Sequence, residues 1–357
     1  MTIFTGRQIT VILPVYNCKK YLRQAVNSVI SQPYWAIKIL LVDDGSTDGS
    51  AVLCDELADQ DKRITVIHQK NGGVSAARNA GMEYIFSSRE NESDYITFLD
   101  ADDVWSVNWI DDQINRLLEQ NYDLIGLQSC ACNDLLTRRT ESKSVQEGDH
   151  KGGVSQIWIH AEHHMGAMLY RVNLIRRYGI RFYNITASED EIFSMQCFYL
   201  ADRIYLTNRL MYLYRQNATS AVHMRKRGIS YFVPIIDAYI QSDAEMAQWE
   251  NDVRGGLHEG RLLAKIYIMD MIEEEWEKNN GTKRIKELLA KRPEYQKILE
   301  ERRGKPIDDR WSDMQKYRQK YIIKNHIHGF AFKVTRGIYY IPLIKTYVDR
   351  KRYPIKV

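Results

Sequence analysis

The sequence predicts an α/β fold built on a doubly wound, mostly parallel β-sheet and followed by a helical C-terminal region. Short β-branched apolar runs alternate with segments of helical periodicity over the first hundred residues. Polar, glycine-rich or acidic residues follow each of these apolar runs. After about residue 226 the pattern becomes mostly helical and highly charged. The chain has 357 residues, enough for two domains or for one large domain with an appendage. Hydrophobic residues make up 44% of it, enough for a sizeable core.

Four strands are expected first, at 9–13 (ITVIL), 37–42 (IKILLV), 63–68 (RITVIH) and 95–99 (YITFL). The helix after the first strand is indicated by apolar residues at helical spacing, namely Leu22, Ala25, Val26, Val29 and Ile30. The segments AVLCDELAD and VSAARNAGMEYIF predict the next two helices. Because helices separate the strands, we expect parallel pairing.

The alternation is less regular from 106 to 225. TASEDEIFSMQCFYLA predicts a helix that starts near Ser188, which forms a capping box with Glu191. RIYLTNRLMYLYRQN predicts one or two strands. We therefore expect a first domain at 1–225, with halves at 1–105 and 106–225, and a helical, basic region at 226–357.

Composition and charge limit the classes of function and the cellular locations that the chain can have. A net charge of +4 is too small for a dedicated nucleic-acid binder. The five cysteines are odd in number, which favours a reducing cytosol over a disulfide framework. The N-terminal segment lacks the pattern of a signal peptide, and no run approaches the roughly 18 apolar residues that span a bilayer. We expect a cytoplasmic protein, soluble or peripheral to a membrane.

The polar residues after the four strands are expected to meet, because parallel strands end at one edge of a sheet and ligands bind there. These segments are Pro14–Asn17, Asp43–Ser46, Asn71–Gly73 and Asp100–Asp103. Asp100 and Asp102 suit a hard divalent cation, which takes one or two carboxylates and substrate phosphates. The alternative is a solvated acidic turn.

The other motifs are weaker when taken alone. Asp44 can accept hydrogen bonds from a base or ribose, while Thr47 or Asp48 is expected to cap the next helix. Gly72 and Gly73 precede a helix that carries Arg78, an arrangement that favours anions or a nucleobase edge. The chain has no Walker loop and no GxGxxG after its first strand, which argues against NAD.

Two further motifs have simple alternatives. Glu189 and Asp190 fall in the first helical turn, where acids are common because of the helix dipole alone. The dipole would lower a carboxylate pKa, and only partial burial beside other acids would raise it. The segment His160–His164 lacks HExxH spacing and is interpreted as ordinary loop histidines.

Five motifs in order resemble the family-2 glycosyltransferases with the GT-A fold. They are VILPVYNCKKYLRQAVNSVISQ, ILLVDDGSTDGS, NGGVSAARNAG, YITFLDADD and SEDEIF, and the resemblance covers roughly 8–225. The resemblance implies relatives among bacterial enzymes that build capsular, exopolysaccharide or lipopolysaccharide chains. The resemblance implies a nucleotide-sugar-binding half at 1–105 and an acceptor half at 106–225.

The resemblance also implies a role for each matching residue. Pro14, Val15 and Tyr16 would line the nucleobase pocket, Asp44 would bind the base, usually uracil, with Asp43 beside it, and Arg78 would lie near the base. Asp100 and Asp102 would form the DxD motif, with Asp100 facing the ribose and Asp102 ligating Mg²⁺ or Mn²⁺ on the diphosphate. Asp190 would be the catalytic base, Arg215 and Ser220 would contact the diphosphate, and His223 would be an extra metal ligand.

These roles describe an inverting transfer of sugar from a nucleoside-diphosphate sugar, with a UDP-sugar expected, to a hydroxyl of a glycan or lipid-linked glycan. A sugar-1-phosphate nucleotidyltransferase would instead want a glycine-rich, basic loop after the first strand, and PVYNCKKYL has no glycine. A non-catalytic carbohydrate-binding scaffold would be expected to lose the charged site residues, yet Asp44, Asp100, Asp102 and Asp190 are all present.

The last segment, 316–357, mixes basic residues with aromatic and aliphatic ones. Asp349 is the only acid in it. Such a segment can lie on an anionic membrane surface, at the inner face of the cell membrane for a cytoplasmic protein. The alternative is a helical cap on the first domain with solvated lysines.

Overall fold

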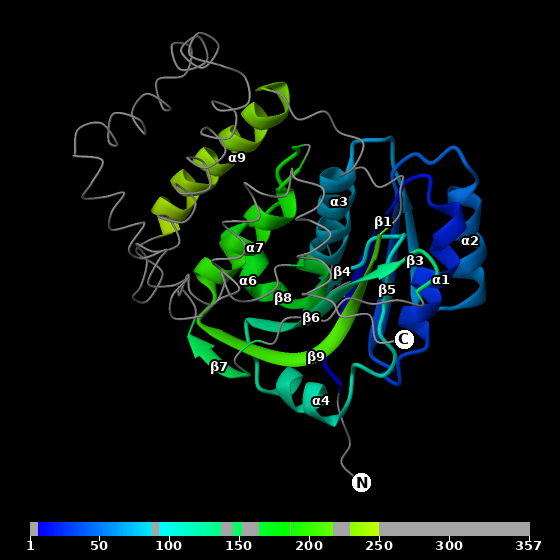
Figure 1. Ribbon diagram of the computed structural model, residues 1–357, viewed down its shortest axis with the longest axis horizontal. Coiled ribbons are helices and arrows are strands. Elements are labelled where there is room, and N and C mark those ends of the chain that lie inside the picture. Colours follow the sequence, from blue (N-terminus) through cyan, green and yellow to red (C-terminus); the bar gives the residue numbers. More distant parts are fainter. Residues whose placement is uncertain are drawn as a thin grey trace, which may run out of the picture. The chain divides into compact units, whose positions relative to one another are not determined.

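The computed structural model describes residues 6–87, 93–136, 145, 147–151, 164–185, 187–216 and 229–249. The chain divides into two compact units, Met1–Glu273 and Glu274–Val357, and every described residue belongs to the first. No described helix is both long and apolar enough to cross a membrane. The described helices and strands are therefore those of the first unit (Figure 1).

A single mixed sheet forms the centre of this unit. In the described part of the chain it has nine strands in the order β3-β2-β1-β4-β8-β6-β9-β5, with β7 paired to β9. The first four strands are parallel and comprise β1 Ile9–Val15, β2 Ile37–Asp43, β3 Ile64–His68 and β4 Tyr95–Phe98. This order confirms the α/β, GT-A-type fold expected from the sequence.

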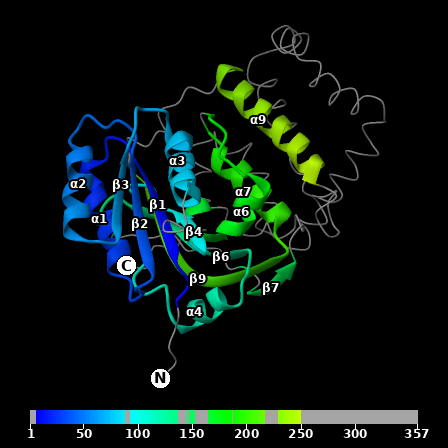
Figure 2. The same cartoon turned by 180° about the vertical axis from the view of Figure 1, so that it is seen from behind.

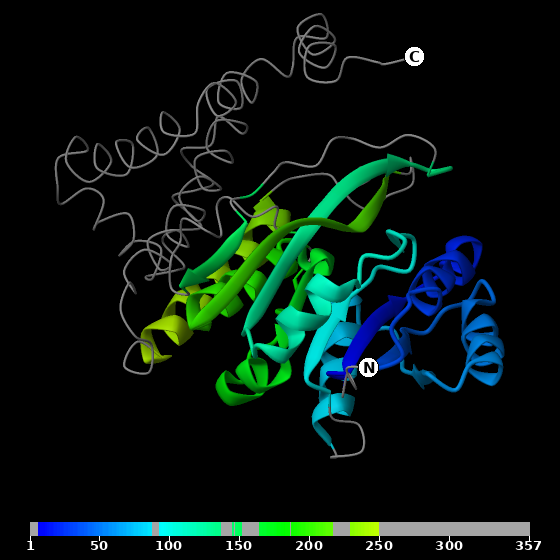
Figure 3. The ribbon, with the colours of Figure 1, turned by 90° about the horizontal axis from the view of Figure 1, so that it is seen from below.

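The second half of the sheet contains longer strands of mixed direction. It consists of β5 Val104–Trp105, β6 Leu124–Asn133, β7 Gly148–Lys151, β8 Met168–Arg171 and β9 Arg203–Gln216. β8 lies antiparallel between β4 and β6, and β6 runs parallel to β9. Figure 3 shows β6 and β9 side by side. The segment predicted to form one or two strands is thus the single strand β9.

Helices cover both faces of the parallel half. Val11 and Leu13 of β1 share a core cluster with residues of α1 Lys19–Ile30 and α2 Ser50–Gln60. Ile12 points the other way, because side chains alternate along a strand, and meets Gly81 of α3 Val74–Ser87. Figures 1 and 2 show α1 and α2 on one side of the strands and α3 on the other. The sheet is therefore doubly wound.

The remaining helices flank the second half. They are α4 Asp112–Glu119, a short 3-10 turn η1 Met165–Ala167, α6 Val172–Tyr178, α7 Glu189–Leu200 and α9 Ile229–Gln248. The Tyr239 hydroxyl of α9 donates to Glu191 of α7 at 3.0 Å. α9 therefore belongs to the first compact unit. A domain boundary at 225 stays a prediction because 250–357 lies outside the described residues.

The capping box predicted for α7 does not form. The helix begins where expected, but Ser188 has φ 62° and its side chain makes no capping hydrogen bond. A capping side chain needs an extended backbone at this position, and Ser188 is left-handed instead. Glu191 is then available to bind Tyr239 of α9.

Candidate active site

The polar residues after the parallel strands meet at one edge of the sheet, as the sequence predicts. Val15 is paired with Asp43, and Asp43 with His68, so the ends of β1, β2 and β3 are level. Pro14 and Val15 are buried, whereas Tyr16 is 49% exposed just beyond β1. An exposed aromatic ring at this edge is available to pack against a planar ligand.

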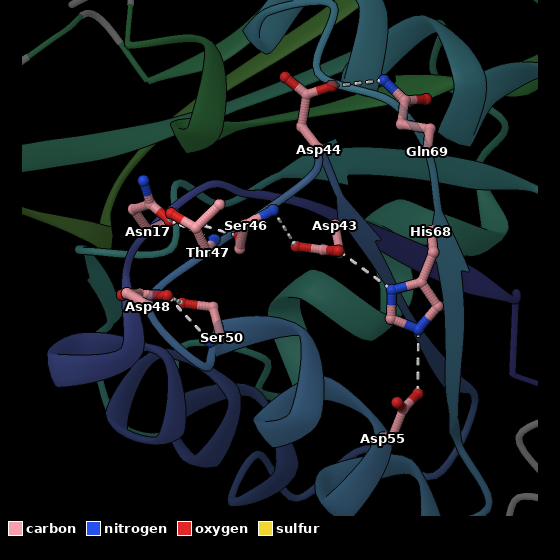
Figure 4. A network of polar contacts seen from close by, with 10 residues as sticks. All are labelled: Asn17, Asp43, Asp44, Ser46, Thr47, Asp48, Ser50, Asp55, His68 and Gln69. Carbon is pink, nitrogen blue, oxygen red and sulfur yellow. Dashed lines mark hydrogen bonds and ion pairs between the residues drawn. The ribbon is translucent and has the colours of Figure 1, made fainter.

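Hydrogen bonds tie the loops after β1 and β2 together (Figure 4). Asn17 donates its N–H to Ser46 at 3.1 Å and accepts from the N–H of Thr47 at 2.8 Å. Asp48 accepts from the N–H of Lys19 at 3.1 Å, where α1 begins, and from that of Ser50 at 2.9 Å, where α2 begins. The N-cap of α2 is Gly49. Asp48 therefore serves both helix starts from just before that position.

Asp43 turns away from the edge and joins a second network. It accepts from the N–H of Ser46 at 3.1 Å and lies 3.0 Å from Nδ1 of His68. The other ring nitrogen of His68 lies 3.1 Å from Asp55. Hydrogen bonds to Asp43, then to Asp55, raise the pKa of His68. Figure 4 shows Asp43 directed at His68, so this carboxylate shapes the loop that carries Asp44.

Asp44 holds the turn that follows β3. Its buried carboxylate accepts from the side chain of Gln69 at 2.7 Å and from the backbone N–H groups of Gly72 and Gly73, both at 2.8 Å. Gly73 has φ +88°, a conformation that suits glycine. A carboxylate has about four acceptor positions, and these three hydrogen bonds leave one of them for a ligand. Asp44 can therefore support the turn and still accept an N–H from a nucleobase.

Arg78 joins three elements that the sequence keeps far apart. Its guanidinium, 4% exposed, donates to Asp100 at 2.8 Å and to Glu189 of α7 at 3.1 Å. Burial would lower the pKa of Arg78, but Asp100 and Glu189 outweigh it and the group stays charged. Arg78 thus links α3, the acidic turn and the first turn of α7. Sequence reasoning missed Glu189 as a partner because its position is explained equally well by the helix dipole.

The acidic turn after β4 concentrates negative charge. Asp103 is 1% exposed and accepts from the Tyr212 hydroxyl at 2.6 Å and the Arg215 N–H at 2.7 Å. Burial, followed by the charges of Asp100 and Asp102, raises the pKa of Asp103 to about 8. A divalent cation at Asp100 and Asp102 would offset this charge, so the residues present fit a metal site. The described residues contain no group of three or more His, Cys, Asp or Glu side chains that could hold a metal ion. Diphosphate oxygens would have to complete the ligand set.

Asp190 lies in the first turn of α7, beside Glu189. Burial raises its pKa to about 7, with further increases from Glu189 and Glu191 and a smaller decrease from Arg78. This outcome reverses the effect expected from the helix dipole alone, because desolvation and two like charges outweigh it. A carboxylate with this pKa is suited to accept a proton at neutral pH.

Arg215 braces the acidic turn from β9. It is buried, and its Nε donates to the carbonyl of Asp102 at 2.6 Å. Its other nitrogens donate to Gln24 at 2.8 Å and to the carbonyl of Asp134. The guanidinium therefore has a structural role here, and its contact with a diphosphate stays a prediction. Ser220 and His223 lie outside the described residues.

The part of the chain that forms this site is similar in sequence to known proteins. Residues 10–179 match the family model described as Glycosyl transferase family 2. Glycosyltransferase GlyG of Streptococcus pneumoniae serotype 4 is 30% identical over 239 residues, which cover 59% of this chain and 72% of GlyG. The chain is a member of glycosyl transferase family 2.

Other relatives of this chain align over varying lengths. Glycosyltransferase GlyA of the same organism is 40% identical over 117 residues, which is 33% of this chain but only 16% of GlyA. The uncharacterized glycosyltransferase EpsJ of Bacillus subtilis is 26% identical over 248 residues, covering 65% of this chain and 66% of EpsJ. The chain thus spans less than two thirds of the length of these two relatives.

A solved structure shares the fold. The crystal structure of TarS from S. aureus in complex with UDP-GlcNAc has a TM-score of 0.60 and 18% sequence identity, covering 82% of this chain and 79% of TarS. At this level of identity the likeness concerns the fold. It agrees with the GT-A architecture described above.

Proposed function

We propose that this chain transfers a sugar, with inversion, from a nucleoside-diphosphate sugar to a hydroxyl of a glycan or lipid-linked glycan. One observation carries the proposal. Buried Arg78 forms ion pairs with Asp100 of the acidic turn and with Glu189, the residue before Asp190. It therefore links the carboxylate proposed to face the donor, Asp100, to the helix that carries the proposed catalytic base, Asp190. Membership of glycosyl transferase family 2 supports the reaction class. TarS binds UDP-GlcNAc, which supports a UDP-sugar as donor.

The nucleotide would lie along the edge formed by the parallel strands. Tyr16 can pack against the base, and Asp44 can accept its N–H through the remaining acceptor position. Asp102 would hold Mg²⁺ or Mn²⁺ together with the diphosphate, and Asp100 would face the ribose. Such an ion neutralises charge that develops on a diphosphate leaving group. His223 as a further metal ligand, and Ser220 and Arg215 as diphosphate contacts, remain part of the proposal.

Asp190 supplies the base for the transfer. Its carboxylate accepts the proton of the acceptor hydroxyl, whose oxygen forms a bond to the anomeric carbon. The bond from that carbon to the diphosphate oxygen breaks at the same time, and the nucleoside diphosphate leaves with the electron pair. A single displacement of this kind inverts the anomeric centre. The burial that raises the pKa of Asp190 serves this step.

Two other functions fit the chain less well. A nucleotidyltransferase would need a glycine-rich basic loop after β1, where the sequence has PVYNCKKYL. A non-catalytic carbohydrate-binding scaffold would not need a proton acceptor such as Asp190, whose pKa is raised to about 7. We further propose a role in bacterial polysaccharide biosynthesis. We also propose that the protein lies in the cytoplasm, at the inner face of the membrane, and the basic segment 316–357 supports this location.

The experiment is a panel of UDP- and GDP-sugars incubated with the full chain, with release of the nucleoside diphosphate as the measurement. We expect release from at least one UDP-sugar with Mn²⁺ or Mg²⁺, and none after EDTA until the metal is restored. Asp190→Asn should bind the same donor while release falls by about two orders of magnitude or more. No release from any donor, or full release after rigorous chelation, would contradict the proposal.

A further inference from the structure

His164 stands beside the acidic turn, although the mechanism above does not use it. It directly precedes η1, and its ring centroid lies 3.9 Å from that of Tyr212, with the planes tilted by 36°. The Tyr212 hydroxyl donates to Asp103 at 2.6 Å and accepts from the N–H of Asp100 at 3.3 Å. The imidazole therefore packs on the same tyrosine that supports the DxD motif.

The chain is built to bring His164 this close. A Cβ on Gly166, two residues later, would lie 2.7 Å from the carbonyl oxygen of Phe98 and closer still to the Tyr212 ring. Only glycine permits such an approach without displacing β4 or Tyr212. The position of His164 over Tyr212 is consequently a product of close packing between η1, β4 and β9.

Among the described residues, the hydrogen bonding of the His164 ring is incomplete at one nitrogen. Nδ1 is buried and makes no hydrogen bond to any residue in the described part of the chain. Burial lowers the pKa of His164 to about 4, against an opposing effect of Asp100, so the imidazole is neutral. A neutral imidazole nitrogen either donates or accepts, and a hydroxyl can meet either need. A buried polar atom without a partner costs free energy that a bound hydroxyl would recover.

We propose that Nδ1 of His164 forms a hydrogen bond with a hydroxyl of the sugar carried by the donor, and so contributes to sugar specificity. The inference rests on the proposed function. Tyr212, on which the imidazole packs, accepts from the N–H of Asp100 and donates to Asp103, so His164 lies beside the acidic turn on the side of the site assigned to the donor. Its place on Tyr212 puts it next to the turn that would hold the diphosphate, where the transferred sugar must start.

The test compares three variants with the wild-type full chain. The probes are UDP with Mn²⁺, for binding, and the UDP-sugar that the wild type hydrolyses fastest, for kinetics. His164→Phe keeps a ring on Tyr212 and removes the nitrogens. His164→Asn places an amide where Nδ1 lies, and His164→Gln places it where Nε2 lies. Thermal unfolding of each variant reports whether the fold is kept.

We expect His164→Phe to bind UDP as the wild type does while kcat/KM for donor hydrolysis falls about tenfold to a hundredfold, the range for an unpaired polar group. His164→Asn should recover most of this loss, and His164→Gln should recover little. If His164→Phe does not fold, the difference between the Asn and Gln variants still decides the proposal.

Three outcomes would overturn it. Wild-type kcat/KM in His164→Phe would remove His164 from the donor site. An equal loss of UDP binding would assign it to the nucleotide instead of the sugar. A defect seen only when an acceptor is present would place the contact on the acceptor. A wild-type chain that hydrolyses no nucleotide sugar would reject the proposed function itself, and this arm is separate from the comparison of variants.

Discussion

At the scale of single residues, the electrostatics of Asp190 are the feature with the clearest consequence. Three consecutive acids, Glu189, Asp190 and Glu191, open α7. Glu189 pairs with Arg78, and Glu191 accepts from Tyr239, so both flanking carboxylates have partners. Asp190 lies between these two charges and is desolvated, and this combination raises its pKa to about 7. The neighbouring residues therefore set the strength of the base.

The first prediction concerns pH. A carboxyl group with a raised pKa is protonated below that pKa and cannot accept a proton, so kcat should fall about tenfold per pH unit below about 7. Glu189→Gln removes a like charge and leaves Arg78 less neutralised. Both effects lower the pKa of Asp190, and the acid limb of the pH–rate profile should move to lower pH.

A matched control separates this effect from a general change in charge. Glu83→Gln removes an acid from the exposed face of α3 and should leave the profile where the wild type has it. An acid limb that stays in place in Glu189→Gln, while the protein remains folded, would show that Asp190 is not the titrating base. An acid limb in Asp190→Asn identical to that of the wild type would lead to the same conclusion.

At the scale of secondary-structure elements, one side chain serves two helices. Asp48 accepts from Lys19 at the start of α1 and from both the N–H and the hydroxyl of Ser50 at the start of α2. Helix starts leave backbone N–H groups without partners, and a carboxylate is favoured there by the helix dipole. Asp48 thus stabilises the two helices that flank the loops carrying Tyr16 and Asp44.

The second prediction follows from this double contact. Asp48→Ala should lower the free energy of unfolding by about 1–2 kcal/mol, the range for loss of a helix cap, measured by urea denaturation at pH 7. Asp59→Ala, an exposed acid near the end of α2, is the control and should stay within about 0.5 kcal/mol of the wild type. Equal stability of Asp48→Ala and Asp59→Ala would contradict the capping role.

The pH dependence gives an independent check. Burial acts to raise the pKa of Asp48, but hydrogen bonds from Ser50 and Lys19 outweigh it, and the pKa is lowered. A lowered pKa in the folded state means that the stabilisation is present above the unfolded-state pKa of about 3.9 and is lost as the pH falls through the folded-state pKa. The difference in stability between the wild type and Asp48→Ala should therefore shrink in acid.

At the scale of the whole molecule, the sequence predicts features that leave a local pattern and misses contacts between residues far apart in the chain. The strands of the parallel half were predictable because β-branched runs such as ITVIL bury both faces, and parallel strands bring their ends to one edge. The ion pair of Arg78 with Glu189 could not be predicted, because Glu189 lies 111 residues away in the chain and leaves no local pattern. Tyr212 resembles any core residue of a strand, although its hydroxyl supports the acidic turn.

The last prediction concerns the segment beyond the described residues. Eleven basic residues and one acid lie in 316–357, interleaved with aromatic and aliphatic side chains. We expect the full chain to co-sediment with vesicles that contain phosphatidylserine, and to be released by salt because the attraction is screened.

Replacing Arg350, Lys351 and Arg352 by Gln removes three positive charges, each worth about 1 kcal/mol at such a surface. The partitioning of the chain onto the vesicles should therefore fall roughly a hundredfold. Replacing the basic residues of another exposed site, Lys19 and Lys20, should change it little. If the full chain does not bind anionic vesicles, the membrane role is rejected, and the helical cap considered for this segment is the alternative.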